Sequence, residues 1–247
     1  MSRVVTLTTD FGTADGYVGE MKGVLLSLAD VQIVDITHEI PPQDVEMGRL
    51  TVARTWRRFP PDTIHLIVVD PGVGSSRAAL AVESDGRFLV GPDNGILSPG
   101  LLEPSARAFA LPVPKHASAT FHGRDVFAPA AASLARGDGI DSLGTPALDP
   151  IILRTPAPTR RPDGAIEGEI IAIDRFGNAI TNLAGIDSGT VSVGTRSLPV
   201  CGTYADAPFG APVVVAGSSG LLEIAIRNDS AARVLGISRG DRVTVRA

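Results

Sequence analysis

The sequence predicts a two-domain protein, in which an α/β N-terminal domain with a mainly parallel sheet precedes a small all-β, barrel-like C-terminal domain. Two observations predict this fold class. Short apolar runs alternate with helical patterns over residues 1–154, as in strand–helix–strand units. After a proline-rich segment, the rest of the chain consists of short strand-like runs separated by glycine-rich turns.

The N-terminal part contains four apolar, mostly β-branched runs that each stop at a polar, Gly or Pro turn. We expect buried strands at Val4–Thr8, Ile33–Ile36, Ile64–Val69 and Phe88–Val90. Apolar side chains recur at helical spacing over Gly16–Leu28, and further helices are expected at Val45–Phe59 and Asp125–Ala135. Asp125 would lie in the first turn of the last helix, where the helix dipole favours a carboxylate.

A linker is predicted at residues 155–164, because TPAPTRRPDG combines three prolines and a glycine with polar residues and resists both helix and strand. The boundaries that follow are residues 1–154 for the α/β domain and 165–247 for the second domain. In the second domain we expect an antiparallel barrel or sandwich. Its strands are predicted at Glu169–Asp174, Thr190–Val193, Pro212–Ala216, Leu221–Ile226 and Arg242–Val245.

Composition and charge argue against several classes of function. The net charge is −5 and the arginines are scattered, so no basic surface for nucleic acid is expected. The single cysteine cannot form an internal disulfide, and no Cys/His cluster has zinc-like spacing, so neither a disulfide nor a structural metal is expected. The N-terminus has no signal-like apolar region, and every apolar run is far shorter than the roughly 20 residues of a membrane helix. We expect a cytoplasmic protein that does not bind a membrane.

Polar residues follow the predicted strands, where ligands of open α/β sheets bind. They are Asp10 in TTDFG, Asp35 to His38 in DITH, Asp70 in VVDPGVGSSR and, in the later loop TFHGRD, His122. Taken singly, each has an ordinary structural explanation, because aspartates often cap turns or helices and a histidine can be a core residue. Only their combination indicates a functional site.

Seven ordered blocks, covering nearly the whole chain, resemble the S-adenosyl-L-methionine (SAM) hydroxide adenosyltransferases, whose relatives include a fluorinase and a chlorinase. The blocks are TTDFG, PPQDVEMG, VVDPGVGSSR, GPDNG, TFHGRDVFAP, IDRFGNAITN and SSGLLEIA. The resemblance implies an enzyme that hydrolyses SAM to adenosine and methionine, by attack of an activated water on ribose C5′. It implies no cofactor and no metal.

The resemblance also implies the catalytic residues. Positions that match Asp70, Arg77 and His122 form the family's water-activating triad, and this sequence keeps all three. The halogenating relatives replace the aspartate and the histidine with uncharged side chains. A carboxylate at position 70 would repel a halide, so the triad favours water as the nucleophile.

The implied substrate contacts come from both domains. The position of Asp10 binds the ribose hydroxyls, as a carboxylate can do for a vicinal diol, and Phe11 and Asp70 are expected beside it. In the second domain Asp174, Phe176 and Asn178 would receive adenine and the sugar, while Ser218 and Glu223 match positions that hold the methionine carboxylate and amine. Ser219 departs from the aromatic residue or arginine of many relatives. The family forms a trimer with its sites between subunits, which implies a homotrimer here.

Three other functions stay open from the sequence. One is a halide-using adenosyl transferase, and the second is a module that binds the same ligand without turnover. The third is a metal-dependent hydrolase, although no compact ligand motif supports it; its ligands would be Asp10, Asp35, His38, Asp70 and His122. Capping, turn or packing roles are expected for the remaining candidates, which are His38, His65, His116, Asp93 and Trp56.

Overall fold

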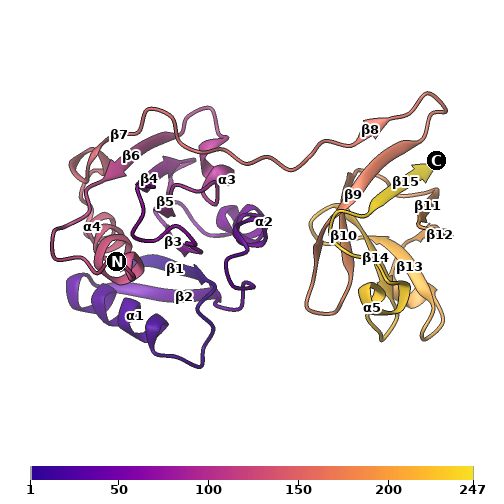
Figure 1. The fold of residues 1–247 in the computed structure, drawn as a ribbon, viewed down its shortest axis with the longest axis horizontal. Helices are drawn as coiled ribbons and strands as arrows, with labels where there is room; N and C mark the ends of the chain where they lie inside the picture. The colour runs from indigo at the N-terminus through magenta and orange to yellow at the C-terminus, as the bar shows by residue number, and fades with distance from the viewer. Residues whose placement is uncertain (1, 247) are drawn as a thin grey trace. The chain divides into compact units, whose positions relative to one another are not determined.

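A computed structural model describes residues 2–246 and divides into two compact units, Met1–Arg154 and Thr155–Ala247. Figure 1 shows an α/β unit built from the first part of the chain and an all-β unit built from the last part. The predicted fold class is confirmed in both parts.

The N-terminal unit contains a seven-stranded sheet in the order β2-β1-β3-β5-β4-β6-β7. Its strands are β1 (Arg3–Thr9), β2 (Val31–Thr37), β3 (Ile64–Val68), β4 (Ala79–Ser84), β5 (Arg87–Pro92), β6 (Arg107–Leu111) and β7 (Thr145–Pro146). Strands β2, β1, β3 and β5 pair in parallel, which is the part that the sequence predicted. Strands β4, β6 and β7, which were not predicted, extend the sheet by antiparallel pairs and make it mixed.

Helices cover both faces of this sheet. They are α1 (Tyr17–Leu28), α2 (Val45–Thr55), the 3₁₀ turn η1 (Trp56–Arg58), α3 (Ser98–Leu101), the π-helical turn η2 (Gly123–Phe127), α4 (Ala128–Arg136) and the 3₁₀ turn η3 (Ile140–Ser142). Residues of α1 and α4, such as Met21 and Leu134, share one buried apolar cluster with the sheet. Val52 of α2 and Trp56 of η1 share a second buried cluster with the sheet. In the described chain, no helix has the length and apolar character to cross a bilayer.

The helix predicted at Asp125–Ala135 forms with Asp125 in its first turn, but this first turn is π-helical. Asp125 lies in the π-helical turn, and α4 begins three residues later, at Ala128. The Asp125 carboxylate accepts a hydrogen bond from the backbone N–H of Ser118 at 2.8 Å and pairs with Arg124. Asp125 therefore also holds the preceding loop in place.

The C-terminal unit is a closed barrel of seven strands in the order β10-β14-β13-β12-β11-β15-β9, with β9 pairing back onto β10. Its strands are β8 (Thr159–Arg160), β9 (Ile166–Ile173), β10 (Ala179–Ala184), β11 (Thr190–Val193), β12 (Arg196–Cys201), β13 (Pro212–Ala216), β14 (Leu221–Ile226) and β15 (Arg242–Arg246). The short helices are η4 (Tyr204–Asp206) and α5 (Ala231–Leu235). The five strands predicted in this domain all form, whereas β10 and β12 were missed. All pairs are antiparallel except β12 with β13.

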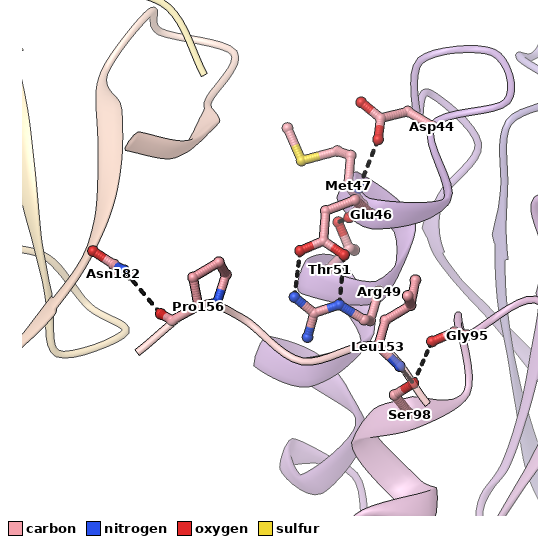
Figure 2. Close-up of polar contacts among 10 residues, drawn as sticks. All are labelled: Asp44, Glu46, Met47, Arg49, Thr51, Gly95, Ser98, Leu153, Pro156 and Asn182. Carbon is pink, nitrogen blue, oxygen red and sulfur yellow. Dashed lines mark hydrogen bonds and ion pairs between the residues drawn. The ribbon is translucent and has the colours of Figure 1, made fainter. Parts of the chain in front are cut away.

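The expectation that residues 155–164 contain no strand is wrong in one detail. A tight turn, closed by hydrogen bonds between Arg161 and Ala165 and between Gly164 and Arg161, folds the chain back so that β8 pairs with β9. Figure 2 shows how the chain is held on either side of the unit boundary. Leu153 N donates to Ser98 Oγ at 2.8 Å in the first unit, and Asn182 Nδ2 donates to Pro156 O at 2.9 Å in the second.

His65 is a packing residue of the N-terminal sheet. It is 3% exposed, its Nδ1 lies 2.8 Å from the Thr6 hydroxyl, and the ring of Phe59 meets its ring at 79°. Burial, and then the positive charge of Arg87, lowers the pKa of His65 to about 4. The neutral form is therefore built into the fold.

This burial predicts a loss of stability in acid. An unfolded histidine binds a proton near pH 6.5, whereas folded His65 does so only near pH 4, so acidification between these values favours the unfolded chain. Trp56 is the single tryptophan and lies in the same unit, so its fluorescence reports unfolding of this domain. Between pH 7 and 4.5, the free energy of unfolding should fall by about 2 kcal/mol more in the wild type than in His65→Asn. An equal fall in both proteins would contradict the buried neutral histidine.

Candidate active site

The carboxyl ends of two neighbouring strands bring two of the predicted site residues to one edge of the sheet. Strands β1 and β3 are parallel, with Thr9 paired to Val68. Asp10 follows β1 directly, and Asp70 comes two residues after Val68. Because parallel strands end at the same edge, both carboxylates leave the sheet where α/β proteins bind ligands.

Asp70, Arg77 and His122 form one hydrogen-bonded cluster. Arg77 Nε donates to Asp70 Oδ1 at 2.9 Å, and Arg77 Nη2 contacts Asp70 Oδ2 closely. The same Nη2 lies 2.9 Å from His122 Nδ1. The side chains of Asp70 and Arg77 are 5% and 9% exposed, and His122 is also buried. Two loops, separated by 45 residues, thus supply a buried cation, an anion and an imidazole to one place.

Close backbone contact holds these two loops together. Gly74 has φ +75°, and a Cβ there would lie 2.4 Å from the backbone oxygen of Ala119. Only glycine fits such a position without strain, because a side chain would meet both a left-handed backbone and a carbonyl. Gly123 packs against side chains instead, because a Cβ there would lie 3.2 Å from the sulfur of Met21 and 3.5 Å from a methyl group of Val68. A backbone contact therefore joins the loop of Asp70 to the loop of His122, and this contact fixes the relative positions of the two side chains.

A further residue near Asp70 was missed from the sequence. Asn94, in the GPDNG block, donates from Nδ2 to the backbone oxygen of Val69 at 2.8 Å. Its Oδ1 accepts the backbone N–H of Ile96 at 3.2 Å. Asn94 thereby ties the end of β3 to the loop after β5. The block was noted as part of a resemblance, but no chemical role pointed to this asparagine.

The hydrogen bond between Arg77 and His122 defines the protonation state of the imidazole. A guanidinium has only donors, so His122 Nδ1 must be the acceptor. A neutral His122 then carries its proton on Nε2. Burial, and next the positive charge of Arg77, lowers the pKa of His122 below its usual value. The carboxylates of Asp70 and Asp125 raise this pKa, but their effect is smaller. The cluster therefore holds a neutral imidazole with a donor at Nε2.

Asp10 and Phe11 lie in a turn that other residues hold in place. Asp10 Oδ2 accepts the backbone N–H of Gln43 at 2.8 Å, and Gln43 has φ 67°, an unfavourable conformation for a side-chain-bearing residue. The ring of Phe11 lies 5.9 Å from the rings of both Tyr17 and Phe121. Asp10 Oδ1 has no hydrogen-bond partner among the described residues, so one oxygen of this carboxylate can accept from a ligand.

Asp35 and His38 support this turn through side-chain contacts. His38 Nε2 lies 3.1 Å from Asp35 Oδ1, and its Nδ1 lies 2.9 Å from the hydroxyl of Thr9. Burial raises the pKa of Asp35, but the hydrogen bond from Lys22, at 2.6 Å, and the close contact with His38 outweigh it, so the pKa lies below its usual value. Both side chains are thus engaged with protein groups. Within residues 2–246, no three His, Cys, Asp or Glu side chains are grouped closely enough to hold a metal ion.

The remaining predicted contacts lie in the C-terminal unit. Asp174 organises its own turn, because Oδ1 accepts the backbone N–H groups of Phe176 and Asn178 and Oδ2 accepts Asn178 Nδ2 at 3.0 Å. Phe176 is 78% exposed, whereas Asn178 is buried. Ser218 lies exposed in the turn between β13 and β14, and Glu223 is buried on β14. Tyr204, which was missed from the sequence, donates its hydroxyl to Glu223 Oε2 at 2.7 Å.

The other candidates have the structural roles expected of them where the structure records a contact. Asp93 Oδ1 accepts the backbone N–H of Ile151 at 2.8 Å, and Trp56 is buried in the second core cluster of the N-terminal unit. His116 lies exposed at the surface. None of the three touches the Asp70–Arg77–His122 cluster through a recorded hydrogen bond.

The fold and the cluster define a class of protein, namely an α/β domain with a buried Asp–Arg–His set followed by a β-barrel domain. Residues 5–144 match the model of the SAM hydroxide adenosyltransferase N-terminal domain, and residues 168–244 match that of its C-terminal domain. The chain therefore belongs to the SAM hydroxide adenosyltransferase family, as its sequence blocks predicted.

Relatives of two kinds resemble the chain over almost its full length. An (R)-S-adenosyl-L-methionine hydrolase of Thermus thermophilus is 43% identical over 96% of this chain and 97% of the relative. A fluorinase of Actinopolyspora mzabensis is 29% identical over 98% of this chain and 96% of the relative. A crystal structure described as an uncharacterized conserved protein from Thermotoga maritima has a TM-score of 0.89 and 32% identity, covering 99% of this chain and 100% of that one.

Proposed function

We propose that this protein is a SAM hydrolase, which splits SAM into adenosine and L-methionine by attack of an activated water on ribose C5′. The buried cluster in which Arg77 holds both Asp70 and His122 is the main support for this reaction. The relatives named (R)-S-adenosyl-L-methionine hydrolase support the same reaction, and they favour the R configuration at sulfur for this chain too.

The cluster suits a water nucleophile. His122 Nε2–H can donate to the water oxygen, and Asp70 is the acceptor for the proton that the water loses, because the lone pair of His122 Nδ1 is already taken by Arg77. Arg77 fixes the Asp70 carboxylate through two contacts. As the water oxygen bonds to C5′, the C5′–S bond breaks and methionine leaves as a neutral thioether, which needs no acid. The substrate's positive charge disappears, so a buried site favours the reaction.

A halide-using reaction fits this site less well. The Asp70 carboxylate is almost fully buried, and a chloride or fluoride ion beside it would meet repulsion that only one guanidinium offsets. The fluorinases among the relatives are also less similar to this chain than the hydrolases are. The relatives named as hydrolases argue against a module that binds SAM without turnover, and release of adenosine over time tests this directly.

The substrate contacts follow from the free polar atoms. Asp10 Oδ1 would accept a ribose hydroxyl. Asn178 Nδ2 is taken by Asp174, which leaves Asn178 Oδ1 to accept from the amine of adenine, while exposed Phe176 can lie against the purine face. Ser218 and Glu223 are assigned to the methionine carboxylate and amine, and Asp174 contributes by shaping the turn.

We also propose a homotrimer with its sites between subunits. The assigned contacts divide between the two units of the chain, with Asp10 and Asp70 in one and Asn178 and Glu223 in the other. Residues 155–164 would act as the linker, and a closed ring is the usual result of heterologous contacts between domains of neighbouring subunits.

We assign the protein to the cytoplasm, with which its single cysteine is compatible.

The origin of the oxygen in adenosine tests the reaction. In isotopically labelled water, the label should enter the 5′ oxygen of adenosine, because the attacking oxygen stays on C5′, and mass spectrometry of the nucleoside detects it. The matched control is Asp70→Asn, which keeps the side-chain shape and should turn over roughly 10²–10⁴ times more slowly. Label at another position, or a 5′-halo nucleoside at high chloride, would rule out the hydrolase.

Mixing two inactive variants tests the shared site. Asp70→Ala and Asn178→Ala are each expected to be inactive, and they should regain activity after they are dissociated together and reassembled, because some interfaces then receive both intact halves. Each variant carried through the same procedure alone serves as the control. Absence of recovery, together with a monomeric mass by light scattering, would reject the trimer with shared sites.

A further inference from the structure

Glu223 is a buried carboxylate on the outer face of the barrel. Along β14, Leu222, Ile224 and Ile226 point into the main core of the barrel. Glu223 alternates with them, and its neighbour on the same face, Ala225, packs in a separate small cluster with Ala207. A segment that crosses this face, residues 204–211, therefore covers Glu223, which is only 5% exposed.

The covering segment is anchored at several points. Thr203 and Asp206 form a reciprocal capping box around η4. Arg227 donates from Nη1 to the backbone oxygens of Ala205, at 3.2 Å, and Ala207, at 2.8 Å. The guanidinium of Arg227 also lies over the ring of Phe209, 4.1 Å from its centroid. These contacts place Tyr204 in one position above β14.

Tyr204 is the one residue among those described that donates a hydrogen bond to the Glu223 carboxylate. Its hydroxyl lies 2.7 Å from Oε2. The other oxygen, Oε1, is turned toward the backbone of Gly217, where a Cβ would lie only 1.8 Å from it. Gly217 directly precedes Ser218, so the unpartnered oxygen lies beside the turn that we assign to the methionine end of the substrate.

A buried carboxylate is costly unless a cation or several donors compensate it. The described residues supply only one donor to Glu223, and a small cation, such as the α-ammonium of an amino acid, would complement this carboxylate. Burial, and then the hydrogen bond to Glu223, raises the pKa of Tyr204 to about 12. The hydroxyl therefore remains a donor throughout the neutral range.

We infer that Tyr204 is a positioning residue for the amino-acid end of the substrate, because its hydroxyl holds Glu223 Oε2 and thereby directs Oε1 to the ammonium group. The inference rests on the proposed function and adds a residue that acts through Glu223. Tyr204 does not touch the reacting atoms, so it should affect binding of the methionine moiety and not the chemical step.

The variant Tyr204→Phe tests this role, since it removes the hydroxyl and keeps the ring. We expect KM for SAM to rise roughly tenfold with kcat unchanged, which corresponds to the loss of one hydrogen bond to a charged group. By calorimetry, the Kd of L-methionine in the presence of adenosine should rise by a similar factor, whereas the Kd of adenosine should not change. The matched control is Ser192→Ala, which removes a barrel hydroxyl that lies 3.3 Å from the Ser197 hydroxyl and should leave all these constants unchanged.

The outcomes separate the inference from the proposed function. Unchanged methionine affinity, an equal loss of adenosine affinity, or a fall in kcat alone would overturn the role of Tyr204. If the wild type does not hydrolyse SAM, the proposed function fails, but the Kd of L-methionine still tests Tyr204.

If Tyr204→Phe does not fold, Glu223→Gln replaces it. The pKa of Tyr204, followed by ultraviolet absorbance, should then return toward 10, and no change would contradict the contact.

Discussion

The Arg77 guanidinium is the constraint on which the rest of the site depends. Among the described residues, Arg77 is the one with hydrogen bonds to both Asp70 and His122, and its side chain is itself nearly buried. A buried carboxylate without this partner would carry a large desolvation cost, and removal of one member of a buried pair is more damaging than the pair is stabilising. Because Arg77 only donates, it also fixes which nitrogen of His122 bears the proton. One side chain thus sets the position, the charge and the tautomer of the cluster.

The fold around this interaction serves to bring two distant loops into contact. Parallel strands β1 and β3 end together, which places Asp10 and Asp70 at one edge of the sheet. Glycines at the points of closest approach, Gly74 above all, let backbone meet backbone. The π-helical turn before α4 presents His122, and such turns are often found at functional sites. The positions of the site residues therefore depend on backbone geometry, which the side-chain types alone do not predict.

Much of this could be predicted from the sequence, and the failures have physical causes. The strands that were predicted are apolar, as in β3 and β13, so their pattern was clear. Strand β10 carries Thr181 and Asn182, whose side chains bond to backbone groups, and β12 contains Pro199, so neither had a strand-like pattern. The π-helical character of the turn before α4 was not predicted, because nothing in the local sequence distinguishes it from the first turn of an α-helix.

Seven sequence blocks predicted the candidate site. They did not predict the residues that hold the site residues in place. Asn94 and Tyr204 act through other side chains or backbone, at separations of 25 and 19 residues from their partners. No periodicity or spacing marks such contacts, since they depend on which segments the fold brings together. Asp174 was assigned to the ligand, and in the structure its carboxylate is bonded within its own turn.

The protonation state of His122 depends on its contact with Arg77 and can be measured. Nitrogen NMR of the imidazole, assigned by comparison with His122→Asn, distinguishes the two neutral tautomers and the charged form. We expect a neutral ring at pH 7 with the proton on Nε2. In Arg77→Met, where the donor to Nδ1 is lost, the tautomer or the pKa of His122 should change. A proton on Nδ1, or a charged ring at neutral pH, would contradict the arrangement in which Arg77 holds Asp70 and His122 together.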